Sequence, residues 1–217
     1  MTTFIPALTL PHQVFENAAA SILLPIALGT AVGYSTRPKA TQKTYAAIKN
    51  PLTALPHGSL ARHGPSFTGA PAHTSPFLLL NQYATTNMSN YSLMGYAAHR
   101  AINTGLSPFS SIEHINMTKQ GATLYTIQLG LNLIWMPLFF GLKRPIEATV
   151  DIVALLGVNT YLTYLWGSVD AVAGACLVPY LGWLSFATYL CAGAGYLNDW
   201  DLKGAEERAA AATDKKQ

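Results

Sequence analysis

The sequence carries little charge. Lys, Arg, Asp and Glu together make up 11% of its 217 residues, whereas they make up about 25% of a typical soluble domain. A composition this poor in charge excludes an ordinary soluble fold and is typical of a membrane protein. The mean hydropathy is only +0.24, because two polar stretches, residues 36–75 and 198–217, dilute the apolar runs. The apolar runs therefore decide the class of protein.

Several kinds of site are also missing. The two cysteines, Cys176 and Cys191, both lie in the last apolar run, which excludes a disulfide framework and a cysteine metal site. The histidines at positions 57, 63 and 73 are irregularly spaced and predict no metal site. The apolar runs contain neither a serine, histidine and aspartate arrangement nor a pair of carboxylates, so we predict no catalytic residues and no required cofactor.

The charge that is present is dispersed. The net charge is +3, and no basic patch alternates with aromatic residues, so nucleic acid is not an expected partner. Residues 1–13 contain neither Lys nor Arg. This N-terminus is typical of neither a secretory signal nor an Arg-rich transit peptide.

Five stretches are candidates for crossing a bilayer, and the second is the weakest because a polar run, residues 84–90, interrupts it. They cover residues 14–34, 78–101, 123–141, 145–166 and 174–197. We therefore predict an all-α membrane protein, one five-transmembrane-helix bundle with a long polar loop at residues 36–75 and a polar C-terminal tail at residues 198–217.

The stretch at residues 123–141 carries amides and aromatic rings at helical spacing. Five of its residues follow one another at steps of three, four, three and four: Tyr125, Gln128, Asn132, Trp135 and Phe139. They share one face of a helix. Because Gln and Asn are costly in hydrocarbon, this face must contact other helices or a cavity. Two interpretations stay open: the amides hydrogen-bond to neighbouring helices, which is their commoner use, or they line a ligand site together with the rings.

The last two stretches also carry polar and aromatic residues. Glu147 and Asp151 follow Pro145 in the opening turns of the fourth stretch, where the helix dipole favours negative charge. For Asp151 a proton-relay role is the alternative, and both accounts stay open. One face of the fifth stretch holds Tyr180, Trp183, Ala187 and Cys191.

The distribution of Lys and Arg predicts the orientation. Five spans place the two termini on opposite sides of the membrane. The side of the C-terminus carries eleven of these residues, in the first loop, in the turn at residues 141–145 and in the tail, and the other side carries two. Because basic residues concentrate in cytosolic loops, we predict a cytosolic C-terminus.

Four blocks of the sequence resemble the translocator protein family, also called tryptophan-rich sensory protein or peripheral benzodiazepine receptor, and above all its fungal members. The blocks are Tyr45-x-x-Ile48-Lys49-x-Pro51, Tyr91-x-x-Met94-Gly95-Tyr96-Ala97, Gln128-Leu129-x-Leu131-Asn132-x-x-Trp135-x-Pro137-x-Phe139-Phe140-Gly141 and Pro179-Tyr180-Leu181-x-Trp183-x-x-Phe186-Ala187. The resemblance implies a five-helix bundle, often a homodimer, that acts as a receptor or transporter in the mitochondrial outer membrane. The endoplasmic reticulum is the alternative.

The resemblance also implies a ligand pocket inside the bundle. Its ligands would be tetrapyrroles such as protoporphyrin or haem, with cholesterol or another sterol on the outside. A flat macrocycle suits aromatic walls with a few amides that fix its orientation. Carried over by position, the residues that the resemblance assigns to ligand binding are Tyr45, Gln128, Asn132, Trp135, Phe139, Tyr180, Trp183 and Ala187.

The sequence departs from the family at residues 52–90. The usual Trp-x-Pro-Pro and Phe-Gly-Pro-x-Trp segments are absent, and the second of these tryptophans falls at Asn87. A translated intron or a frame error in the gene would produce such a break, and sequencing the mature transcript tests this hypothesis. In the fifth stretch, Cys191 replaces an asparagine of the family.

Two alternative functions follow from the resemblance and the tail. Bacterial relatives have been suggested to break down bound porphyrin by photooxidation through a tryptophan pair. Here Trp183 is present and its partner position is Asn87, which argues against that enzyme. A structural membrane protein that recruits partners through its tail is the other alternative. Deletion of the tail separates it from the binder, which would keep its ligand affinity.

Overall fold

The computed structural model describes residues 4–35, 48 and 76–214, and the side chains of most of them. Its elements are η1 (Pro6–Leu8), α1 (His12–Glu16), α2 (Ala18–Ser35), α5 (Pro76–Gly105), α6 (Ile112–Met136), η2 (Pro137–Gly141), α7 (Pro145–Val169), α8 (Ala171–Leu197) and α9 (Leu202–Asp214). The described residues contain no strand. The prediction of an all-α protein is therefore confirmed.

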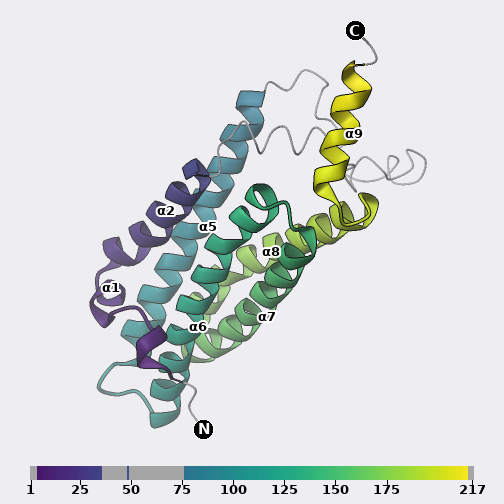
Figure 1. Ribbon diagram of the computed structural model, residues 1–217. Coiled ribbons are helices and arrows are strands. Elements are labelled where there is room, and N and C mark those ends of the chain that lie inside the picture. The colour runs from purple at the N-terminus through teal and green to yellow at the C-terminus, as the bar shows by residue number, and fades with distance from the viewer. Residues whose placement is uncertain (1–3, 36–47, 49–75, 215–217) are drawn as a thin grey trace, which may run out of the picture.

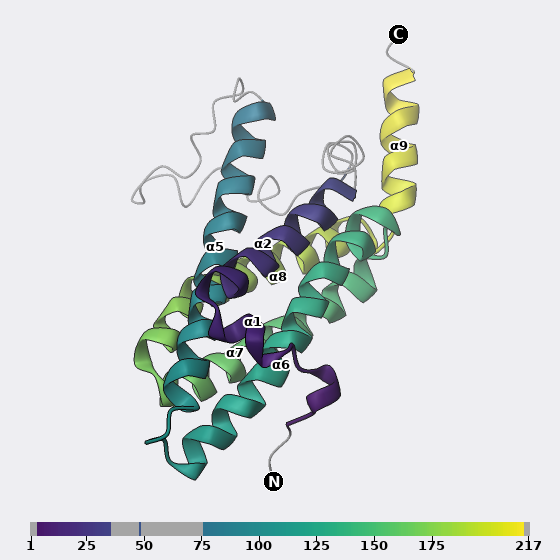
Figure 2. The same ribbon diagram turned by 90° about the vertical axis from the view of Figure 1, so that its left-hand side faces the viewer.

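The long helices form one bundle (Figures 1 and 2). Their contacts follow a ring in the order α2, α5, α8, α7 and α6, and smaller contacts between α6 and α2 close it. Helices α2, α6 and α8 end at the end of the bundle where α5 and α7 begin, and α9 extends from that same end (Figure 1). From α5 to α8 this alternation is what short connections between successive membrane helices produce.

Local sequence signals set the ends of these helices. Ser111 begins α6, because its side-chain oxygen accepts a hydrogen bond from the His114 amide at 3.2 Å. Asp170 begins α8 in the same way, with 2.8 Å to the Val172 amide and 3.1 Å to the Ala173 amide. Pro145 occupies the first turn of α7, where its missing N–H costs nothing.

Four of the described helical segments are long and apolar enough to cross a membrane. They are Ala18–Ser35, Ile112–Gly141, Pro145–Val169 and Ala171–Leu197. A multi-pass membrane protein is thereby confirmed. Helix α5 is 30 residues long but contains the polar run that weakened the second predicted span, so the count of five spans stays a prediction.

The bounds of several elements differ from the predicted ones. The predicted first span is split into α1 and α2, because the Asn17 side chain starts a new helix by accepting from the Ala19 amide at 2.9 Å. Helix α6 begins at Ile112, well before residue 123, since its cap at Ser111 precedes the apolar run. The tail contains α9, whose Leu202 and Ala205 are buried. Sequence periodicity alone did not reveal that α9 packs against the bundle.

Candidate ligand site in the bundle interior

The inner face of α7 brings polar groups into the centre of the bundle. Its buried residues recur at helical spacing: Asp151, Leu155, Asn159, Leu162 and Trp166. Asn159 is 1% exposed and Asp151 is 9% exposed. An amide and a carboxylate buried this deeply in a membrane helix are expensive, so they require partners or a function.

Gln128 of α6 faces Asn159 across the interior. The Asn159 side-chain nitrogen donates to the Gln128 oxygen at 3.4 Å, a long hydrogen bond, and to the Leu155 carbonyl oxygen at 2.9 Å. Gln128 is fully buried. Among the described residues, neither the Gln128 side-chain nitrogen nor the Asn159 side-chain oxygen has a hydrogen-bond partner. The pair thus satisfies only part of its hydrogen-bonding capacity.

Two tyrosine hydroxyls in the interior also lack hydrogen-bond partners among the described residues. Tyr125 of α6 stacks on Trp166, with ring centroids 5.5 Å apart, and Tyr180 of α8 is 4% exposed. Neither hydroxyl is hydrogen-bonded to any part of the chain that the structure describes. Tyr180 also lies close enough to Tyr91 and Asp151 to interact with them electrostatically.

We call this set the interior seam: Tyr125, Gln128, Asp151, Asn159 and Tyr180. Each member is buried, and each has a buried polar atom without a hydrogen-bond partner among the described residues. Few polar groups in a packed protein interior are left in this state, because an unsatisfied buried group costs about 1–3 kcal/mol. The interior seam is therefore a place where ligand or water atoms can supply the missing partners.

Aromatic rings continue the site toward the end of the bundle where α7 begins. Trp135 stacks on Phe139, with centroids 5.3 Å apart and planes 14° apart. The Phe140 ring meets Trp135 edge-on at 5.9 Å. Trp135 also lies beside the Cys191 thiol, whose sulfur is 3.3 Å from the Thr149 hydroxyl oxygen. Cys191 thus faces the same interior.

The remaining predicted site residues lie on the walls. Asn132 donates to the Tyr91 hydroxyl of α5 at 3.4 Å, so it contacts another helix as the packing interpretation requires. Trp183 and Ala187 of α8 are half-buried and pack against the core, and the Trp183 ring lies 6.0 Å from that of Phe186. Tyr45 lies outside the described residues.

Sequence reasoning missed Asn159 altogether. It is a single amide within an apolar run, and only its spacing of eight residues from Asp151 places it on the same helix face. A search for amides on the inner faces of every apolar stretch, and not only on the third, would have found it.

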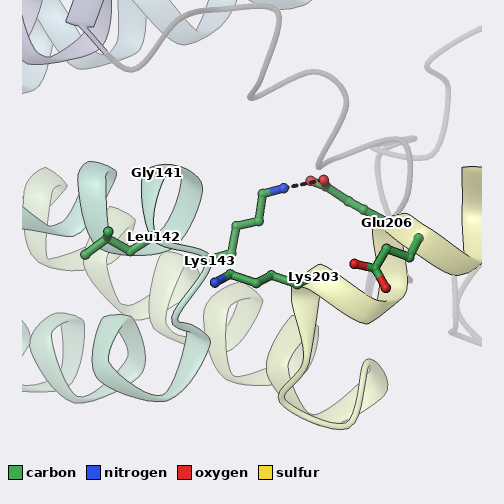
Figure 3. A pocket seen from close by; sticks show the side chains of 6 residues that line it. Gly141, Leu142, Lys143, Lys203 and Glu206 are labelled. Atoms are coloured by element: carbon green, nitrogen blue, oxygen red, sulfur yellow. Dashed lines mark hydrogen bonds and ion pairs between the residues drawn. The ribbon is translucent and has the colours of Figure 1, made fainter.

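A hollow lies outside the bundle interior, between the turn after η2 and helix α9. Its volume is about 400 Å³, and it is lined by Gly141, Leu142, Lys143, Lys203, Glu206 and Glu207. Figure 3 shows Lys143 paired with Glu206 across it. The pair ties α9 to the turn, and the mixed charges suit a surface that faces water.

Fold and interior together define a class: a multi-pass helical membrane protein with a polar, aromatic-walled interior. Comparison with known proteins identifies the family. The sequence model of the TspO/MBR family matches residues 73–197. This range is more than half of the chain and includes α5, α6, α7 and α8, so the chain belongs to the TspO/MBR family.

Individual relatives agree with this assignment. The "Translocator protein homolog" of Schizosaccharomyces pombe is 33% identical over 193 residues, which cover 87% of this chain and 99% of that protein. The "Tryptophan-rich protein TspO" of Archaeoglobus fulgidus is 33% identical over 79% of this chain and 90% of its own length. The human "Translocator protein" is 36% identical over 46% of this chain and 56% of its own length.

Proposed function

We propose that this membrane translocator-type protein binds a tetrapyrrole, protoporphyrin or a haem-related compound, inside the bundle between α6, α7 and α8. The observation that carries the proposal is the interior seam. It holds buried polar atoms that lack partners among the described residues, next to the stacked rings of Trp135 and Phe139. A macrocycle offers flat faces to such rings and polar edges to such atoms.

Helix packing alone does not require buried amide atoms without hydrogen-bond partners. Amides that only join helices gain most when both of their polar ends are paired, because each unpaired end keeps its desolvation cost. The Gln128 nitrogen and the Asn159 oxygen stay unpaired even though the two side chains touch. A bound ligand could supply the hydrogen bonds that these two atoms lack.

The direct experiment is titration of the purified protein with protoporphyrin while intrinsic tryptophan fluorescence is recorded. Trp135 and Trp166 lie at the proposed site, so bound porphyrin should quench them in a saturable way. Excess unlabelled sterol in the same titration tests whether sterols share the site. Quenching that rises linearly with porphyrin concentration would mean collision in the micelle and would exclude the proposal.

The location of the protein is a further part of the proposal. We place it in the mitochondrial outer membrane, with the endoplasmic reticulum as the alternative and the C-terminus in the cytosol. The orientation rests on the sequence count, in which the side of the C-terminus carries eleven Lys and Arg residues and the other side carries two. A protease added to intact organelles should remove a C-terminal tag; protection of the tag would reverse the orientation.

A further inference from the structure

Asp151 is an acidic residue in the bundle interior. It lies on the buried face of α7 and is 9% exposed, and its Oδ2 atom has no hydrogen-bond partner among the described residues. Glu147, one turn earlier, is exposed and pairs with Arg144 at 3.3 Å. The helix dipole accounts for Glu147 at the start of α7, but it does not require a carboxylate buried one turn deeper.

No basic side chain in the described part of the chain neutralises Asp151. The two nearest cations in the sequence have other partners, since Arg144 pairs with Glu147 and Lys143 pairs with Glu206. The groups that interact with Asp151 from α8 are Tyr180 and Cys191, and neither carries positive charge. A carboxylate inside a membrane protein normally has a counter-charge or serves as one for a ligand.

The register of α6 and α7 places the Trp135 ring at the level of this carboxylate. The helices run antiparallel and Gln128 contacts Asn159. Two helical turns from that contact, Trp135 on α6 therefore lies level with Ile152, the neighbour of Asp151. Trp135 and Asp151 both lie near Cys191 of α8. The negative faces of stacked rings and a buried carboxylate attract the same kind of ligand, an organic cation.

We infer that Asp151, with Trp135 and Phe139, forms a binding site for protonated hydrophobic amines, in which the carboxylate supplies the counter-charge and the rings hold the apolar body. The inference rests on the proposed function to the extent that both place a ligand inside the bundle. It adds a second class of ligand, which the Asp151 carboxylate selects by its positive charge, at the end of the site where α7 begins.

Two probes of equal shape test the site. N,N-dimethyl-2-naphthylmethylamine is protonated at pH 7, whereas 2-isobutylnaphthalene is neutral and nearly isosteric. The affinity of each for the purified protein is measured by tryptophan quenching and corrected for its partition into protein-free micelles. We expect the amine to bind wild-type protein at least tenfold more tightly than the hydrocarbon. Equal affinities would overturn the inference without any variant.

The variant Asp151→Asn keeps the shape of the side chain and removes the charge. It should abolish the preference for the amine while the affinity for the hydrocarbon stays within about twofold. Glu147→Gln is the matched control on the same helix and should keep the preference. A preference that survives in Asp151→Asn would overturn the inference. Protoporphyrin titration of the same preparations reports on the proposed function separately, because porphyrin can bind where the amine does not.

Discussion

The two sides of the bundle are built in different ways. Between α2 and α5 the backbones meet through small residues: the Ser21 hydroxyl donates to the Gly95 carbonyl oxygen at 2.8 Å, and a Cβ atom on Gly95 would overlap the backbone of Ser21 and Ile22. Between α6, α7 and α8 the buried facing side chains include amides, aromatic rings and a carboxylate, although the α7 and α8 backbones also meet closely at Gly167 and Gly174. This second side contains the interior seam.

The difference shows how a membrane bundle can combine stability with a site. Lipid offers no hydrophobic force between helices, so close backbone contact through small residues supplies van der Waals packing on the α2–α5 side. That side therefore fixes the frame. The α6–α7–α8 side keeps polar atoms without partners among the described residues, and these atoms gain when a ligand satisfies them.

The largest expected effect is on the closely packed side. Gly95→Leu forces side-chain atoms into the backbone of α2 and should cost about 3 kcal/mol of folding free energy, the upper part of the usual range for overpacking. Thermal unfolding in detergent measures the loss. Gly33→Ala in α2 is the control, because a Cβ there meets no atom within 4 Å. Equal melting temperatures for wild type and Gly95→Leu would mean that this side does not hold the frame.

On the other side, removal of a ring should weaken binding more than folding. Trp183→Ala takes away one half-buried aromatic wall on α8 and should reduce protoporphyrin affinity by about 1–3 kcal/mol. The quenching titration measures it. Tyr196→Ala, on the same helix but 75% exposed, should leave affinity unchanged. An unchanged affinity in Trp183→Ala would place the ligand elsewhere.

A third prediction concerns the end of the bundle opposite α9, where Asp170 joins the two sides. Arg100 of α5 contacts its carboxylate at 2.8 Å and Thr104 donates to it at 3.0 Å. Burial alone would raise the pKa of Asp170, but hydrogen bonds from the Ala173 and Val172 amides, Arg100 and Thr104 hold this pKa below its ordinary value of 3.8. A depressed pKa means that the ionised form stabilises the folded state.

The stability that Asp170 supplies should therefore be complete above pH 3.8 and fall as the pH drops from there through its lowered pKa. Asp170→Asn keeps the helix cap, because Asn caps a helix as well as Asp does, and removes the ion pair with Arg100, so it should lower the melting temperature at pH 7 and lose part of the acid sensitivity. Melting temperatures at pH 7 and pH 3 measure both effects. Glu113→Gln, at an exposed first-turn position of α6, is the control. If Asp170→Asn is as acid-sensitive as wild type, the carboxylate does not join the two sides.

A smaller change in stability is expected at Asn132. Asn132→Leu removes one long hydrogen bond to Tyr91, which in a bilayer is worth about 0.6 kcal/mol. If Asn132 also orients the ligand, porphyrin affinity should fall by about 1–3 kcal/mol. Measurement of both quantities on this one variant separates the two interpretations of the α6 face. A lower melting temperature with unaltered affinity would mean that Asn132 only packs against α5 and does not bind the ligand.

The sequence was sufficient for much of the fold. Apolar run length and the low charge identified the membrane helices, and the spacing of amides and aromatic rings placed Gln128, Trp135 and Phe139 on one face of α6 and η2. Helix starts were harder to predict, since Ser111 precedes the predicted span at residues 123–141 and Asn17 lies inside the predicted span at residues 14–34, which it divides into two helices. The packing of α9 depends on Leu202 and Ala205, too few apolar residues to reveal an inner face.

The site was less predictable, because it depends on which helices face one another. Gln128 was identified from its own helix, but its contact with Asn159 requires the register of α6 against α7. Spacing alone left Asp151 between a dipole role and a proton relay. Only the three-dimensional arrangement shows that Asp151 is buried and that its Oδ2 atom lacks a hydrogen-bond partner among the described residues. These two observations favour a role in ligand binding.

The central claim, that the interior seam is a ligand site, is tested most directly at Gln128. Gln128→Leu removes a buried nitrogen that lacks a partner among the described residues, and it removes only a long hydrogen bond from Asn159, whose nitrogen keeps the Leu155 carbonyl as its acceptor. The empty protein should therefore melt at about the same temperature, while protoporphyrin affinity should fall by about 1–3 kcal/mol. Gln120→Leu is the matched control: its amide also donates to α7, to the Tyr161 hydroxyl at 3.2 Å, but at an exposed position, and its affinity should not change. A lower melting temperature for Gln128→Leu with unchanged porphyrin affinity would contradict the account and make the interior seam a helix contact only.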